Sequence, residues 1–190
     1  MTRTAKHVMR NPYLVGEKVY LRALEEADAA ECYPWFSDPD VRRTLDTPVR
    51  ARPNTEAVSR DIIRGADARH AVMFAIVTRA HGVHIGNCEL GNINHVDGRA
   101  ELGIAIGRKD HWGRGHATEA VALLCRHAFE GLNLHRVYLG CWANNPRALA
   151  VYGRVGFKTE GRRRQHAFIE GQWVDEIVLG LLRGEMKMPP

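Results

Sequence analysis

Long hydrophobic runs, internal repeats and low-complexity tracts are missing from this sequence of 190 residues. The apolar stretch at residues 120–125, for example, ends after six residues at Arg126, whereas a membrane-spanning helix needs roughly 18 apolar residues. We therefore expect no membrane span and no repeat array. With 45% apolar and 26% charged residues, the composition is that of an ordinary globular protein, and the length favours a single domain.

Paired cysteines and a signal-peptide core are missing as well. The cysteines form neither a C-x-x-C pair nor a zinc-binding spacing: Cys32, Cys88, Cys125 and Cys141. Reduced thiols of a cytoplasmic protein explain them better than disulfides, so we expect a cytoplasmic location and no metal. The first ten residues carry basic side chains and no acidic one, which fits either a frayed terminal arm or a transit sequence.

Neither sign of charge dominates, because 27 basic and 22 acidic residues leave a net charge of +5. This mild excess is spread along the chain and suits an acidic small ligand. It is too weak to imply nucleic acid, and no helix-turn-helix or aromatic stacking pattern supports that partner. We expect no nucleic-acid binding.

Strand-like and helix-like segments alternate from residue 17 onward. Helices are expected at 24–36, 53–68, 113–130 and 146–154. Strands are expected at 72–78, 83–92, 99–107, 137–141, 157–164 and 173–182. Pro34 should interrupt or bend the first helix, and the second should place Val58, Ile62 and Ile63 on its apolar side.

The order of these segments predicts the fold class. The strands within 72–107 follow one another closely and predict an antiparallel meander. The strand–helix–strand section at 99–142 needs a crossover, which makes its two strands parallel neighbours. A meander joined to one parallel crossover is an α+β fold with a mixed sheet.

A strand, a glycine turn and the start of a helix follow one another at residues 106–120. The first turn of a helix offers unpaired N–H groups and a partial positive charge, which suit a phosphate. Gly113 and Gly115 would let a pyrophosphate approach the main chain. Three nearby side chains add cationic or hydroxyl groups: Lys109, Arg114 and Thr118. From spacing alone, an anion-binding turn and a purely structural turn are equally open.

Two better-known phosphate loops do not fit these residues. A Rossmann fingerprint needs a third small residue where Thr118 stands, and an acid where His135 and Arg136 stand. A P-loop needs G-K-[S/T], which is absent from the sequence.

A second cluster lies at residues 142–157. Asn144 or Asn145 is expected to cap the helix that follows. Tyr152 lies seven residues after Asn145, two turns further along the same helical face. A helical tyrosine of this kind is usually a core residue, but it can also serve as a proton donor, with an ordinary pKa of about 10.

Together these motifs resemble the GNAT superfamily of acetyl-CoA-dependent N-acetyltransferases. The resemblance rests on Glu101-Leu102-Gly103-Ile104, Trp112-Gly-Arg-Gly-His-Ala-Thr-Glu-Ala, Asn145 and Tyr152-Gly-Arg-Val-Gly-Phe157. The opening at 19–24 and the closing Trp173-Val174-Asp175-Glu176 are most similar to the RimJ/RimL-type ribosomal-protein alanine acetyltransferases. The similarity covers residues 17–185 and implies one acetyltransferase domain there, between an N-terminal arm at 1–16 and a tail at 186–190.

The resemblance also implies a twisted, mostly antiparallel sheet with helices on both faces. Acetyl-CoA would lie in a V-shaped cleft where the strand at 101–107 splays from the strand at 136–142. The pyrophosphate would bind the amides of Gly113, Arg114, Gly115, His116, Ala117 and Thr118. The pantetheine arm would pair with Ile104, Ala105 and Ile106, and Asn145 would bond it from the other side. Asp110 stands where the family has Gln or Arg, which removes a contact that some members use.

For catalysis, the resemblance implies that Tyr152 protonates the departing thiolate and that a main-chain N–H near Ile104 stabilises the oxyanion. Glu101 is the candidate base, acting through water, or else a solvated strand carboxylate. It faces the same side as Gly103 and Ala105, which leaves room for a substrate. The competing bases are histidines that the sequence does not place: His84, His95, His111 and His116. Cys125 and Cys141 are expected in the core, so no covalent acetyl-enzyme is expected.

The implied function is direct transfer of an acetyl group to a primary amine, on a protein N-terminus or a small amine or amino-acid-like compound. The alternative is a catalytically silent, CoA-binding regulatory relative. The protein would be a monomer or a homodimer, and its basic charge disfavours polyamine acceptors. By resemblance, the acceptor pocket is built from the first two helices and a loop at 165–172, and the sequence leaves open whether Trp35 or Trp173 lines it. The arginines at 162–164 fit a protected sheet edge better than an anion site.

Overall fold

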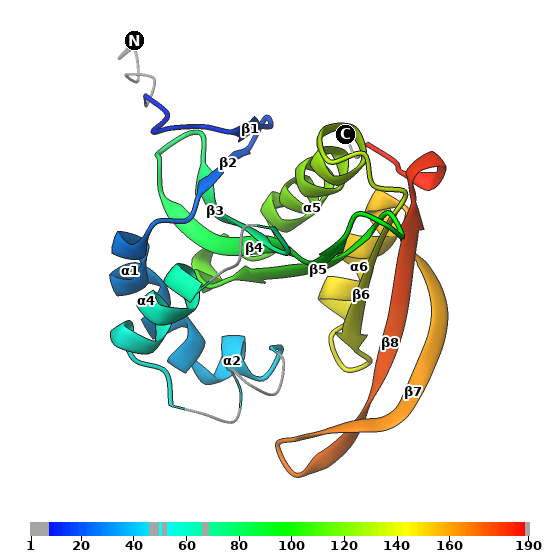
Figure 1. The fold of residues 1–190 in the computed structure, drawn as a ribbon. Helices are drawn as coiled ribbons and strands as arrows, with labels where there is room; N and C mark the ends of the chain where they lie inside the picture. Colours follow the sequence, from blue (N-terminus) through cyan, green and yellow to red (C-terminus); the bar gives the residue numbers. More distant parts are fainter. Residues whose placement is uncertain (1–7, 46–49, 51–52, 66–68, 189–190) are drawn as a thin grey trace.

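The computed structural model describes residues 8–45, 50, 53–65 and 69–188. Within them the chain forms an eight-stranded sheet in the order β1-β2-β3-β4-β5-β6-β8-β7 (Figure 1). All neighbouring strands are antiparallel except β5 and β6, which are parallel. The strands are β1 (Leu14–Val15), β2 (Val19–Ala23), β3 (Val72–Thr78), β4 (His84–Asn94), β5 (Arg99–Ile106), β6 (Arg136–Trp142), β7 (Lys158–Ile169) and β8 (Gln172–Leu182). The predicted α+β fold is confirmed.

The meander and the parallel crossover both occur where the sequence predicts them. Strands β3, β4 and β5 are consecutive and antiparallel. The chain then passes through α5 (His116–Arg126) and a π-helical turn (His127–Gly131) before β6 runs parallel to β5. Together these segments form the predicted helix at 113–130, although the α-helix itself begins three residues later than expected.

Helices α5 and α6 (Pro146–Val155) share the main core with one face of the sheet. Ala100 and Leu102 of β5 belong to the same buried cluster as Val121 and Leu124 of α5. Leu124 is fully buried, and full burial of a side chain of this size contributes about 1.5–3 kcal/mol. The position of α5, and of its first turn, is therefore fixed by this apolar stripe.

The opposite face of the sheet carries α1 (Ala29–Ser37), α2 (Pro39–Arg42) and α4 (Glu56–Gly65) (Figure 1). Successive strand residues point to opposite faces, and β4 shows this: Cys88 lies in the α5-side core, whereas the Nδ2 atom of Asn87 is 3.3 Å from Sγ of Cys32 on α1. Trp35 also docks α1, because its ring fills the space beside Gly107, only 2.2 Å from where a Cβ would lie. The helices lie on both faces, as expected.

Several boundaries differ from the prediction. A 3-10 turn (Glu26–Asp28) precedes α1, which then continues past Pro34 to Ser37. Of the two predicted effects of Pro34, interruption of the helix is therefore wrong, and a bend stays a prediction. The helix expected at 53–68 is α4, and residues 66–68 lie outside the described part. Within the segment expected as an N-terminal arm, β1 pairs with β2, while residues 1–7, like 189–190 of the tail, are outside the described residues.

The C-terminal hairpin corrects the expected loop at 165–172. Strand β7 continues to Ile169, and the turn is formed by Glu170 and Gly171, both with positive φ, as two-residue hairpin turns require. Strand β7 is the last strand of the sheet. Arg162 and Arg163 pair with Asp175 and Glu176 of β8, which supports a protected edge over an anion site.

The parallel strands diverge after a short contact. β5 and β6 pair only from Arg99–Arg136 to Glu101–Tyr138, after which β5 pairs with β4 alone and β6 with β8. The expected V-shaped splay therefore lies between residues 102–106 and 139–142. None of the helices in the described part of the chain reaches the length and apolarity that crossing a bilayer requires.

Candidate active site

A cleft of about 1280 Å³ occupies the V between β5 and β6 and extends under α1, α2 and α4. Eleven of the twelve residues singled out from the sequence line it: Glu101, Ile104, Ala105, Ile106, Gly113, Gly115, His116, Ala117, Thr118, Asn145 and Tyr152. Arg114, the twelfth, lies between two lining glycines, but its own side chain is exposed and does not line the cleft. The structure thus brings the two motif clusters, about 30 residues apart in the sequence, into one cavity.

The backbone conformation of the glycine turn directs the N-terminus of α5 into this cleft. Gly113 and Gly115 have φ values of 73° and 85°, and Gly115 is the N-cap of α5. A Cβ at Gly113 would meet nothing within 4 Å, so the positive φ, rather than crowding, requires glycine there. The N–H groups of His116, Ala117 and Thr118 form the first helical turn, where intrahelical partners are lacking.

The charged groups around this turn differ from the expectation. Lys109 lies 2.7 Å from Asp38 and 3.0 Å from Asp40, so its charge is shared with carboxylates at the start of α2. Lys18, which sequence reasoning missed, places its Nζ atom 3.0 Å from the Cβ position of Gly115. Only the fold brings residue 18 there: Glu119 of α5 accepts hydrogen bonds from the backbone N–H groups of residues 17, 18 and 19.

The β5 side of the V offers main-chain groups. Ile104 to Ile106 pair with β4 on one side and, within the part of the chain that the structure describes, have no strand partner on the other. The carbonyl of Ile106 accepts a hydrogen bond of 2.8 Å from Nε1 of Trp112, which fixes the end of this strand against the glycine turn. Arg147 of α6 stacks over the Trp112 ring at 5.7 Å. A contact between the two sides of the V therefore exists near the turn.

The other side of the V carries Asn145 and Tyr152. The Oδ1 atom of Asn145 accepts from the N–H of Ala148 at 3.2 Å, so Asn145 is the residue that caps α6. Tyr152 is buried at 7% exposure and packs edge-to-face on Phe157. It also lines the cleft, so Tyr152 is both a core residue and accessible from the cleft.

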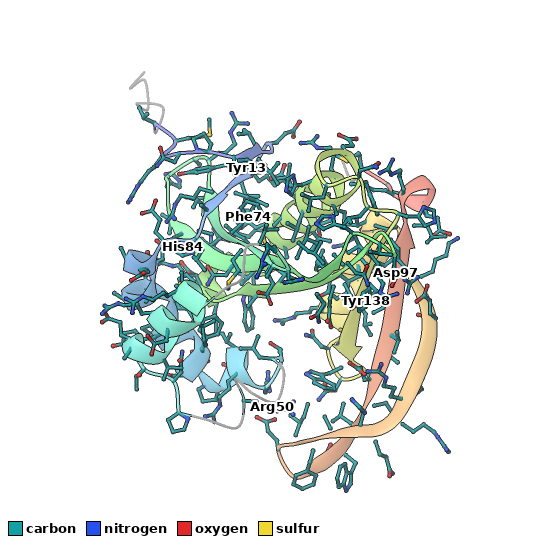
Figure 2. All side chains as sticks on the ribbon, viewed as in Figure 1. Tyr13, Arg50, Phe74, His84, Asp97 and Tyr138 are labelled. Atoms are coloured by element: carbon teal, nitrogen blue, oxygen red, sulfur yellow. The ribbon has the colours of Figure 1, made fainter. Side chains whose placement is uncertain are left out.

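Glu101 lies at the apex of the V, where it pairs with Tyr138, the last β6 residue that pairs with β5. Figure 2 labels Tyr138 on β6. Glu101 is half-buried, and its carboxylate accepts a 2.7 Å hydrogen bond from Asn92 of β4. Burial raises the pKa of the Tyr138 phenol, and the nearby Glu101 charge raises it further. Tyr138 therefore keeps its proton beside this carboxylate at neutral pH.

The room expected beside Gly103 is partly filled. The Cγ and Oε1 atoms of Glu89 lie 3.0 Å from where a Cβ on Gly103 would be. On the other side of the V, Oε1 of Glu176 lies across Gly140 in the same way. Both glutamates line the cleft. The sequence alone did not indicate that these glutamates line the cleft. The pairing of Glu89 with Gly103 and the position of Glu176 over Gly140 both depend on the strand register.

Apolar side chains of α1, α2 and α4 line the part of the cleft under these helices: Phe36, Val41, Val58, Ile62 and Ile63. Val58 and Ile62 are 43% and 53% exposed, so the predicted apolar side of α4 faces the cleft and not a closed core. The tryptophans that line the cleft are Trp112 and Trp142, the latter with Arg50 over its ring at 5.2 Å. Neither Trp35 nor Trp173 does so, since Trp35 packs on Gly107 and Trp173 on Phe168.

The histidines and cysteines differ in where they lie and in the direction in which burial shifts their pKa. His111 and His116 line the cleft beside the glycine turn with ring centroids 5.4 Å apart, and burial lowers the pKa of both. His84 is buried against α1, and His95 lines a separate cavity near the β4–β5 turn. Burial raises the pKa of the Cys125 and Cys141 thiols, which keeps them protonated and argues against a covalent acetyl-enzyme.

Structural comparison places this arrangement among known acetyltransferases. A spermidine N-acetyltransferase from Vibrio cholerae, solved in complex with CoA and spermine, superposes with a TM-score of 0.79 at 25% identity, over 88% of this chain and 97% of that one. RimJ from Mycobacterium smegmatis, solved in complex with CoA-disulfide, superposes with a TM-score of 0.77 at 25% identity, over 90% of this chain and 85% of that one. The RimJ/RimL-type branch is thus represented among the similar structures.

Sequence comparison agrees with the structural one. An uncharacterized N-acetyltransferase, p20 of Bacillus licheniformis, is 30% identical over 177 residues, which cover 90% of this chain and 97% of the relative. Spermidine N(1)-acetyltransferase of Escherichia coli is 38% identical over 101 residues, about half of each chain (53% and 54%). Residues 18–158 match the family model described as an acetyltransferase (GNAT) domain. The protein is therefore an enzyme of the GNAT acetyltransferase family.

Proposed function

We propose that the protein transfers the acetyl group of acetyl-CoA directly to a primary amine while both substrates occupy the cleft. One observation supports this most strongly. The same cleft contains a helix N-terminus suited to a diphosphate, an unpaired strand edge suited to an amide-bearing arm, and a separate region under α1, α2 and α4. A donor and an acceptor can therefore meet at one point, which converts a bimolecular reaction into a positioned one.

In this proposal the chain binds acetyl-CoA through main-chain groups. The first-turn amides of His116, Ala117 and Thr118 hold the pyrophosphate, with Lys18 adding positive charge beside Gly115. The free edge at Ile104 to Ile106 pairs with the pantetheine arm as an added strand would. Asn145 caps α6 through its oxygen, which directs its side-chain N–H groups to the arm.

The proposed chemistry needs three groups from the protein. Glu101, at the apex, accepts the ammonium proton of the acceptor through a water molecule. A main-chain N–H near Ile104 stabilises the oxyanion formed when the amine attacks the thioester. Tyr152 donates its phenolic proton to the thiolate as the C–S bond breaks, and the excess proton at Glu101 returns to the tyrosinate through solvent. The amine nitrogen loses its second proton to solvent as the amide forms, so the products are an N-acetylated amine, CoA and one proton.

The class of amine that accepts the acetyl group can be determined by direct measurement. Two of the relatives above are named for spermidine, whereas the net charge of this chain disfavours polyamines. The cleft is less basic than the whole chain, since its charged lining includes five carboxylates against three arginines: Asp40, Glu89, Glu101, Glu170, Glu176, Arg43, Arg147 and Arg154. A polyamine therefore belongs in the acceptor panel beside a protein N-terminus and a simple alkyl amine.

The test combines binding and turnover. Millimolar acetyl-CoA should raise the melting temperature, by an amount that grows with ligand concentration. Gly115→Trp, which replaces the left-handed N-cap, should abolish the shift. The matched control is Gly161→Trp on β7, where an added Cβ has nothing within 4 Å. Absence of any shift with CoA or acetyl-CoA in the wild type would contradict the proposal.

Turnover separates the enzyme from a silent CoA-binding relative. Free-thiol release from acetyl-CoA is measured with alanine amide, spermidine and hexylamine. Tyr152→Phe should lower kcat by about 10²–10⁴ while preserving the ring that packs on Phe157, and exposed Tyr13→Phe serves as the control. Binding of acetyl-CoA with no thiol release from any amine would favour the regulatory relative.

A further inference from the structure

The feature that carries a further inference is the glutamate lying across Gly103. Glu89 is the direct cross-strand partner of Gly103 in the β4–β5 pair. Because Gly103 has no side chain, the Glu89 side chain occupies that space, with Cγ and Oε1 at 3.0 Å and Cδ at 3.4 Å from the Cβ position. The carboxylate therefore lies over β5, at the wall of the cleft that it lines.

This position coincides with the place where the reaction would occur. The last β5 residue paired with β6 is Glu101, so Gly103 lies just past the apex of the V. An arm that pairs with Ile106, then Ala105, then Ile104 reaches Gly103 next. The reactive end of acetyl-CoA would therefore arrive beside the slot that Glu89 fills.

We infer that Glu89 binds the ammonium group of the acceptor beside the thioester, an inference that rests on the proposed function. Residues that alternate along β5 share a face, so Glu101 and Gly103 point to the same side of the sheet. Residues that are directly paired also share a face, which places Glu89 there. Two carboxylates of adjacent strands thus stand on the acceptor side, opposite the α5 core.

The two carboxylates have separate tasks. A primary amine is protonated at neutral pH before it reacts, and a carboxylate in a partly desolvated cleft binds an ammonium group more strongly than it would in water. Glu89 supplies that binding charge, and Glu101 accepts the proton as the amine becomes nucleophilic. Glu89 is thus a substrate-binding residue, and its loss should affect the KM of the amine more than kcat.

Two variants test this from different directions. Glu89→Gln removes the charge, and we expect the KM of the amine to rise about 10-fold or more, with kcat within about 3-fold of wild type. Gly103→Ala keeps Glu89 but places a Cβ at 3.0 Å from its Cγ and Oε1. That contact is tighter than most real Cβ contacts, so the Glu89 side chain must shift by a few tenths of an ångström, and the KM should rise in this variant as well.

The measurements use alanine amide, spermidine and hexylamine as acceptors, and calorimetric titration with CoA as an independent readout. The CoA dissociation constant should stay unchanged in both variants, and Glu130→Gln, an exposed glutamate at the π-helical turn, should match the wild type throughout. A wild-type KM in Glu89→Gln overturns the inference. If Glu89→Gln does not fold, a wild-type KM in Gly103→Ala overturns it equally. A wild-type protein that binds CoA but acetylates no amine would instead contradict the proposed function.

Discussion

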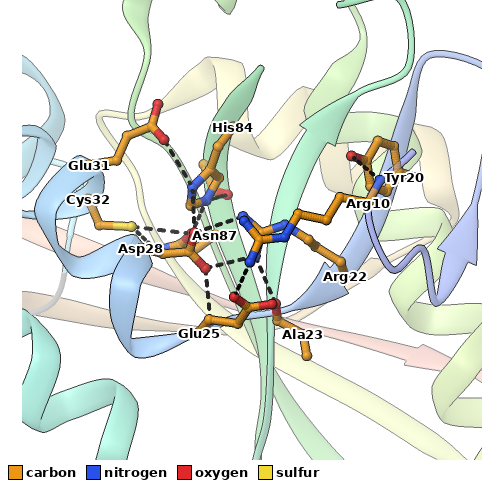
Figure 3. Close-up of polar contacts among 11 residues, drawn as sticks. Arg10, Tyr20, Arg22, Ala23, Glu25, Asp28, Glu31, Cys32, His84 and Asn87 are labelled. Atoms are coloured by element: carbon orange, nitrogen blue, oxygen red, sulfur yellow. Dashed lines mark hydrogen bonds and ion pairs between the residues drawn. The ribbon is translucent and has the colours of Figure 1, made fainter. Parts of the chain in front are cut away.

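His84 is a buried imidazole, 4% exposed, held between β4 and α1 (Figure 3). Its Nε2 atom lies 3.1 Å from the carbonyl of Gly86 and 2.8 Å from Oδ1 of Asn87. Both partners are oxygen acceptors, so the proton of the neutral ring is on Nε2. Its Nδ1 atom has no hydrogen-bond partner among the described residues and lies 3.8 Å from carboxylate oxygens of both Asp28 and Glu31. Nδ1 is therefore the atom that takes up a proton on acidification.

Burial lowers the pKa of His84 below its ordinary value of about 6.5, and the Asn87 bond and the carboxylates of Asp28 and Glu31 offset this only in part. The nearby Arg22, held by two hydrogen bonds to Asp28, lowers it slightly further. Since the unfolded chain binds the proton at a higher pH than the folded chain, stability must fall as the pH drops below that ordinary value.

We expect His84→Gln to flatten the acid side of the stability profile. The glutamine amide can still donate to Gly86, but it does not titrate. The free energy of unfolding, measured by urea titration between pH 7.5 and 5, should decline less steeply in the variant, while exposed His95→Gln should follow the wild type. Some decline should remain, because burial also lowers the pKa of His111, His116 and His127. An equally steep decline in His84→Gln would contradict this assignment.

Helices α1 and α2 use proline in opposite ways. Pro34 is inside α1, where it has no N–H to donate to the carbonyl of Ala30. Pro39 is the first residue of α2, where a missing N–H costs nothing. The break between the helices is at Asp38, whose extended backbone (ψ 125°) is the conformation preferred before proline.

We expect Pro34→Ala to raise the free energy of unfolding by about 1–3 kcal/mol, because it restores a helical hydrogen bond and relieves crowding in the preceding turn. Pro34 is exposed, so the change removes little packing. Pro39→Ala, also exposed, is the matched control and should be neutral or mildly destabilising. Denaturant titration of both variants checks this. If Pro34→Ala raises the free energy of unfolding no more than Pro39→Ala does, Pro34 does not destabilise the interior of α1.

The sequence predicted the order and pairing of the elements better than their boundaries. Period-2 alternation and glycine turns indicated the meander, and the crossover fixed β5 beside β6. The capping role of Asn145 followed from its place before Pro146. The 3-10 turn before α1 and the extension of β7 to Ile169 were missed, because tertiary contacts such as the pairing of β7 with β8 outweigh local propensity.

The site was predicted in the same uneven way. Motif residues close together in the sequence, such as Gly113 and Gly115, could be assigned to one turn. Lys18 and Glu89 could not, because only the fold places each of them beside a cleft-lining glycine, Gly115 and Gly103 respectively. Strand register decides such contacts, and a shift of one residue would turn Glu89 to the opposite face.

At the scale of the whole molecule, the sheet is interrupted along the V (Figure 1). Strands β1 to β5 form one section and β6, β8 and β7 the other, joined by three residue pairs. Helices α5 and α6 cover the junction on one face and share its core. The two sections are therefore connected mainly by packing on that face.

We expect CoA to slow amide hydrogen exchange on both sides of the V. Protection should increase at Ile104 to Ile106 and in the first turn of α5, because these N–H groups gain partners. The turn at Asp97 and Gly98 between β4 and β5, which is not part of the cleft lining, is the internal control and should change least. Exchange is measured by mass spectrometry with and without CoA. Unchanged exchange at both the strand edge and the helix start would contradict the assigned binding mode.

Because only three residue pairs join β5 and β6, this connection also affects thermal unfolding. A CoA molecule bound in the V would act as an additional strand. It would join the five-stranded section (β1 to β5) and the three-stranded section (β6, β8 and β7) into one continuous sheet. The ligand-free chain should then melt less cooperatively than the loaded one. A broader calorimetric transition without CoA, sharpened by its addition, would mark the donor as part of the architecture as well as a reactant.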